Sequence, residues 1–111
     1  MLTGKNKERF EKWFIKYTEQ KIIEGYSYSP FRYFNDLPIS MQFGVIQDYA
    51  DSIGYDVKVY TAHGYFYKWS VRYAVQELAN GTSKTRNEAR KAALKAFDDV
   101  VNGEQGKALE K

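Results

Sequence analysis

Apolar residues near the N-terminus recur at the spacing of a helix. Phe10, Trp13, Phe14 and Tyr17 stand at positions i, i+3, i+4 and i+7, and charged residues lie between them. Three to four apolar positions in every two turns form a stripe along one side of a helix. The spacing therefore predicts an amphipathic helix over residues 5–24.

A second apolar stripe begins after Pro38, a residue that suits the first turn of a helix. Gly54 supplies a stop, because glycine accepts the conformation that often follows a helix end. We therefore predict a second helix over residues 38–53. The aromatic segment between the two helices has no sustained period and is interpreted as a loop. The second stripe consists of Met41, Val45, Ile46, Tyr49, Ala50 and Ile53.

From Tyr55 onward the apolar period changes from helical spacing to two. Val57 and Val59 alternate with polar residues, and a longer alternation follows the turn at 61–64. Alternation of this kind is typical of strands with one buried and one solvated face. Two antiparallel strands joined by a hairpin are predicted. The odd-numbered residues from 65 to 75, Trp69 among them, should face the helices.

The next segment carries turn and capping signals. Asn80-Gly81 is a strong turn signal and predicts a return through a brief third strand at 82–84. Thr85 and Glu88 form a capping box, which predicts that a helix starts at Arg86. We expect this helix to end at Asn102-Gly103.

These elements predict one α+β domain. Its order is α-α-β-β-(β)-α, with an antiparallel sheet of two or three strands and the C-terminal helix packed on that sheet. The domain should span residues 1–101, and 102–111 should form a flexible tail. The chain has 111 residues, of which 43% are hydrophobic and 17% aromatic. This composition suffices for one core without disulfide bonds.

Charge is distributed unevenly, although the formal net charge is only +3. Residues 55–97 contain eight basic and three acidic side chains, an excess that would attract a polyanion if the cations converge on one surface. The hairpin and the third helix carry most of them. The candidate nucleic-acid-binding residues are Lys68, Arg72, Lys84, Arg86 and Arg90.

Residues that carry catalytic or metal chemistry are scarce. The chain has no Cys and one His, His63, which stands in the predicted hairpin turn. Its glycines match no phosphate-binding loop. We therefore expect no catalytic residue, no metal site, no cofactor and no enzymatic activity. No apolar run approaches the roughly 20 residues of a membrane span, so we expect a cytoplasmic protein without membrane contact. No pattern indicates an oligomeric state.

The segment that opens the third predicted helix resembles the C-terminal helix of double-stranded RNA binding domains. That family has the pattern Ser-Lys-Lys-x-Ala-Lys-x-x-Ala-Ala, and residues 85–94 read Thr-Arg-Asn-Glu-Ala-Arg-Lys-Ala-Ala-Leu. The order of elements from 38 to 97 is also similar to that of the family. The resemblance implies phosphate contacts at Arg86, Asn87 and Arg90. The hairpin sequence Ala62-His63-Gly64 departs from the family's Gly-Pro-x-His.

A second resemblance covers more of the chain and indicates a biological context, not an activity. Residues 37–45, 51–55 and 85–90, with Ala92, Ala93 and Ala96, are similar to small uncharacterised proteins encoded in phages and mobile elements of gut bacteria. It implies an accessory protein that binds a host or phage component, and it carries over no catalytic residue.

Two binding functions are therefore expected. The leading hypothesis is a non-catalytic accessory protein that contacts nucleic acid through its basic hairpin and third helix. The alternative is a module that docks a protein partner through exposed aromatics of the 26–34 loop. Convergence of the cations on one surface favours the first, and a large apolar patch on the loop favours the second. The loop aromatics are Tyr26, Tyr28, Phe31, Tyr33 and Phe34.

Overall fold

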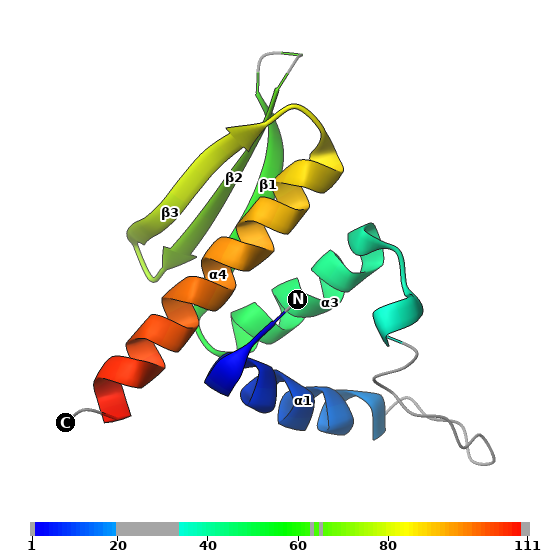
Figure 1. The fold of residues 1–111 in the computed structure, drawn as a ribbon. Helices are drawn as coiled ribbons and strands as arrows, with labels where there is room; N and C mark the ends of the chain where they lie inside the picture. Colours follow the sequence, from blue (N-terminus) through cyan, green and yellow to red (C-terminus); the bar gives the residue numbers. More distant parts are fainter. Residues whose placement is uncertain (1, 20–33, 63, 65, 110–111) are drawn as a thin grey trace.

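The computed structural model describes residues 2–19, 34–62, 64 and 66–109 and confirms the α+β class (Figure 1). A short helical turn at 34–36 precedes the second long helix, and the loop residues 26–33 lie outside the described part. The order of the long elements is two helices, three strands and a helix. They are α1 (Gly4–Glu19), α3 (Ile39–Ser52), β1 (Tyr55–Ala62), β2 (Phe66–Tyr73), β3 (Gln76–Ser83) and α4 (Arg86–Leu109).

The three strands form an antiparallel sheet in the order β1-β2-β3. Val57 pairs with Val71, and Trp69 pairs with Val59 on one side and Gly81 on the other. Val57 and Val71 are buried in the core, and Trp69 packs against it. The odd-numbered residues of β2 therefore face the helices, as the alternation predicts. Val75, predicted on the same face, lies in the turn after β2 and is 91% exposed, so that part of the prediction is wrong. We call this the inner face of the sheet and its opposite the outer face.

The predicted turn at Asn80-Gly81 is wrong, because both residues lie inside β3. The chain reverses instead at Ala74 and Val75, where Ala74 has a φ of 55°. Gly81 has a packing role, since a Cβ at this position would lie 2.6 Å from carbon atoms of the Trp69 indole. The third strand is consequently longer than the predicted 82–84.

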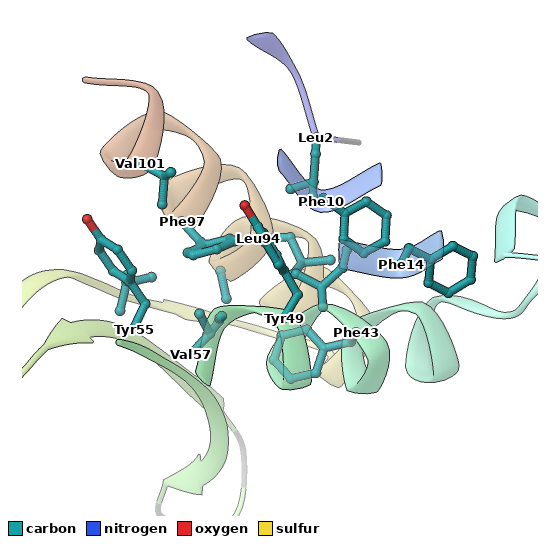
Figure 2. Packing of buried hydrophobic residues seen from close by; sticks show 14 of the residues in the cluster. Leu2, Phe10, Phe14, Phe43, Tyr49, Tyr55, Val57, Leu94, Phe97 and Val101 are labelled. Atoms are coloured by element: carbon teal, nitrogen blue, oxygen red, sulfur yellow. The ribbon is translucent and has the colours of Figure 1, made fainter. Parts of the chain in front are cut away.

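Helices α3 and α4 pack on the inner face, and α1 packs against both (Figure 1). Tyr49 of α3 lies between the other two helices, with its ring 5.4 Å from that of Phe10 and 6.0 Å from that of Phe97 (Figure 2). Phe34 also contacts Phe10, at 5.2 Å, and is only 6% exposed. It belongs to the core, so its predicted place on an exposed docking loop is wrong.

A buried polar network joins the start of α1 to α3 and α4. The Asn6 side chain is fully buried, accepts a hydrogen bond from the Tyr49 hydroxyl at 2.7 Å and donates one to Asp98 at 2.9 Å. The Asp98 carboxylate also accepts hydrogen bonds from the amide and hydroxyl of Thr3. Burial raises the pKa of Tyr49 to about 12.

The predicted end of the last helix at Asn102-Gly103 is wrong, and Asn102 takes part in the same hydrogen-bond network. Asn102 accepts a hydrogen bond from the Asn6 amide at 2.9 Å and donates one to the Thr3 carbonyl. Helix α4 continues through Asn102 and Gly103 to Leu109, so the sequence signal there does not end it. Asn102 thus belongs to the folded domain, and the flexible tail stays a prediction for the residues beyond.

Candidate nucleic-acid interface

The start of α4 is fixed by a side-chain cap. The Thr85 hydroxyl accepts a hydrogen bond from the Glu88 amide at 3.1 Å, which confirms the predicted start at Arg86. Arg86 and Arg90 consequently stand one turn apart on the first two turns of the helix. The positive end of the helix dipole lies at the same place.

Both arginines line a hollow of about 320 Å³ between α3, the end of β1 and the start of α4. Among the described residues that line it, none is acidic. A ligand in this hollow would therefore meet two guanidinium groups together with neutral hydroxyl, amide and aromatic groups. The other lining residues are Ser40, Phe43 and Gln47 of α3, and Val59, Tyr60 and Thr61 of β1.

Neutral neighbours hold the two guanidinium groups. The Arg86 guanidinium carbon lies 5.2 Å from the centre of the Tyr67 ring, on the inner face of the sheet. Arg90 donates a hydrogen bond to the Asn87 side chain at 2.8 Å. Among the described residues, neither arginine forms an ion pair with a carboxylate. Their charges are therefore available to an anionic ligand.

Helix α3 is positioned against this site by its own contacts with the sheet. Gln47 donates a hydrogen bond to the Val57 carbonyl on the edge of β1, at 2.7 Å. The first turn of α3 begins after Pro38 without a side-chain cap, and Ser40 of that turn lines the hollow. The N-terminal ends of two helices thus lie beside one hollow, and both favour negative charge.

Two of the five predicted residues lie on the other side of the sheet. Lys68 and Arg72 are even-numbered residues of β2, and the odd-numbered Trp69 and Val71 face the helices. Successive side chains of a strand point to opposite faces, so Lys68 and Arg72 are on the outer face. The five candidate residues therefore do not converge on one surface, because the sheet separates Lys68 and Arg72 from Arg86 and Arg90.

Arg72 is also surrounded by opposite charge. It pairs across the strands with Asp56 of β1 and Glu77 of β3, and its guanidinium contacts the Val75 carbonyl at 3.4 Å. Opposite charges on facing positions attract each other and leave less net charge for a ligand. Arg72 is therefore a poor candidate for a phosphate contact.

The remaining predicted residue, Lys84, is exposed in the short link between β3 and α4. It precedes Arg86 by two positions but does not line the hollow. His63 lies outside the described residues. Sequence reasoning missed Ser40, Gln47 and Thr61, because uncharged polar residues give no local signal and only the packing of α3 beside β1 brings them to the arginines.

A second hollow of about 610 Å³ lies further along α4. Lys91 and Lys95 line it together with Ile39 and Gln42 of the first turn of α3. Asp98 and Asp99 border the same hollow, so its cations are less available to a phosphate than those of the first hollow. The hollow that contains Arg86 and Arg90 is therefore the better candidate site, and we call it the basic hollow.

Three further observations concern metal sites, membrane spans and similarity to known proteins. The described residues contain no group of three or more His, Asp or Glu side chains placed to share a metal ion. Within the same residues, every helix is too short or too polar to cross a membrane. No protein-family model, curated protein or solved structure matches this chain.

Proposed function

We propose that this protein is a non-catalytic binding protein that contacts the phosphate backbone of nucleic acid at the basic hollow. The observation that carries the proposal is the convergence of Arg86 and Arg90 on a concave surface whose described lining residues include no carboxylate. Arginine favours phosphate because its planar guanidinium presents several donors at once. Ser40, Gln47 and Thr61 add neutral donors of the kind that contact phosphate and sugar.

The resemblance described above supports the same residues. Its phosphate contacts map to Arg86, Asn87 and Arg90, and the observed order α3-β1-β2-β3-α4 is the order that the resemblance implies. Asn87 is hydrogen-bonded to Arg90 and orients its guanidinium instead of standing apart from it. A role in a phage or mobile element stays a prediction.

Fluorescence anisotropy of a labelled duplex, titrated at several salt concentrations, tests the proposal. Affinity should fall as salt rises, because each phosphate contact releases counterions. The double variant Arg86→Ala with Arg90→Ala should bind more weakly and lower the salt slope by about two, roughly one for each lost contact. The effect should be similar for all sequences, since backbone contacts do not read bases.

The matched control is Lys58→Ala with Arg72→Ala, which removes the same formal charge from the outer face. Lys58 already pairs with Asp56 at 3.2 Å, so this control should leave the salt slope nearly unchanged. No duplex binding at low salt would overturn the proposal, and so would an equal loss in both double variants.

A further inference from the structure

Two large aromatic side chains are exposed on the outer face of the sheet. Tyr60 is 48% and Phe66 51% exposed. Both are even-numbered positions at the hairpin end of β1 and β2, opposite in orientation to the buried Val57 and Val71. Core packing therefore explains neither of them.

The register places one lysine beside both of these rings. Lys68 pairs directly with Tyr60 and stands two residues along β2 from Phe66, on the same face. Its partner on β3 is the neutral Thr82. Tyr60, Phe66 and Lys68 thus form a cluster of two rings and one cation, which we call the aromatic platform.

The two ends of the outer face differ in charge. Asp56 and Glu77, which flank Arg72, belong to the opposite end of the strands. No acidic residue pairs with a member of the aromatic platform. The hairpin end is therefore complementary to a polyanion, whereas the far end is neutralised internally.

The aromatic platform is continuous with the basic hollow. Tyr60 belongs to β1, an edge strand, and it lines the basic hollow with Arg86 and Arg90. A nucleic-acid strand whose phosphates lie in that hollow needs only to pass the edge of β1 to reach Phe66 and Lys68. A single strand is flexible enough to bend around this edge, whereas a short duplex is stiff and resists such bending.

We propose that the aromatic platform stacks unpaired bases, so that the ligand is a duplex with a single-stranded extension. This inference rests on the proposed function, because the duplex part is held at the basic hollow. Aromatic rings stack on bases of any sequence, because every base has a flat aromatic face. A neighbouring lysine can contact the phosphate backbone of the same strand. The aromatic platform would therefore select for unpaired structure and not for sequence.

The test compares a blunt duplex with the same duplex carrying a single-stranded extension, by fluorescence anisotropy. The extension should raise affinity about tenfold, the effect of stacking one base. Phe66→Ala should abolish this preference without changing affinity for the blunt duplex, because Phe66 does not line the basic hollow. Phe66→Tyr should keep the preference, since it keeps a ring.

Tyr73→Ala serves as a control for the loss of a half-exposed ring away from the aromatic platform, since Tyr73 is 50% exposed at the other end of β2 and lies on the inner face beside Tyr55. It should leave the preference intact. Affinity for the blunt duplex reports that each variant is folded. Normal blunt-duplex binding without a preference for the extension would overturn this inference alone, and a preference that survives Phe66→Ala would also overturn it. Failure to bind either duplex would instead overturn the proposed function on which it rests.

Discussion

Replacement of Asn6 by alanine should strongly destabilise the domain, although Asn6 is far from the proposed site. Its side chain is fully buried and joins three helices, because it bridges Tyr49 of α3 and Asp98 of α4. Alanine leaves both partners in place and removes the side-chain groups that satisfy them, so the Tyr49 hydroxyl keeps only a long contact of 3.4 Å to the Asn6 backbone carbonyl. Buried polar groups that lose their partner keep the cost of leaving water.

Asp98 and Tyr49 are affected differently by the substitution. Asp98 keeps three other donors, from the Thr3 amide, the Thr3 hydroxyl and Asn102, so it loses one hydrogen bond and is not left alone. A hydrogen bond to a charged group contributes about 1.5 to 3 kcal/mol, and a buried hydroxyl that loses its short acceptor costs about 1 to 3 kcal/mol. The free energy of unfolding should therefore fall by about 2.5 to 6 kcal/mol, out of the roughly 5 to 15 kcal/mol typical of a domain.

Urea denaturation followed by tryptophan fluorescence measures this change, with Asn35→Ala as the control on an exposed asparagine. The control should stay within about 0.5 kcal/mol of wild type. Tyr49→Phe in the Asn6→Ala background should cost little further or restore stability, because it removes a buried hydroxyl that has lost its short acceptor. A shift below about 1 kcal/mol for Asn6→Ala, or full additivity of the two substitutions, would refute the reasoning.

Three further predictions concern stability. Thr85→Ala should cost about 1 kcal/mol by removing the cap of α4, and an unchanged urea midpoint would contradict it. Gly81→Ala should cost about 1 to 3 kcal/mol, because the new Cβ displaces the Trp69 indole; unchanged near-ultraviolet circular dichroism would argue against this contact. The pKa of Tyr49 is raised to about 12, so its contribution to stability should be intact below pH 10 and decline between pH 10 and 12, where the unfolded phenol ionises first. Tyr49→Phe should lack this decline, and an identical alkaline profile would disprove the assignment.

Periodicity and capping predicted most of the fold, because both signals are local. The stripe that includes Tyr49 located α3 to within one residue at each end, and Thr85 located the start of α4. The alternation around Trp69 assigned the inner face correctly. These features depend on the direction of neighbouring side chains along one element, which the sequence records directly.

Local motifs gave wrong predictions where a contact with a residue distant in the sequence decides the structure. Asn80-Gly81 has the sequence of a turn, but the indole of Trp69 on the next strand requires a glycine there. Asn102 has the sequence of a helix end, but the N-terminal segment uses its side chain as a hydrogen-bond partner. In both cases a tertiary contact decides what a local motif does.

The candidate site was only half predictable for the same reason. Arg86 and Arg90 are identified by the helix start, which is local. Lys68 and Arg72 carry the right charge, but strand alternation places them on the opposite face from the helices. Summed charge along a segment does not distinguish the two faces of a sheet.

The most direct test of the proposed site is a titration of the isotope-labelled protein with a nucleic-acid duplex, followed by backbone amide NMR. The largest chemical-shift changes should fall on the residues around the basic hollow, Ser40, Thr61, Arg86 and Arg90 among them, and the Arg86→Ala/Arg90→Ala variant should lose them. Changes concentrated around Asp56, Arg72 and Glu77 on the outer face, or none at the start of α4, would contradict the account.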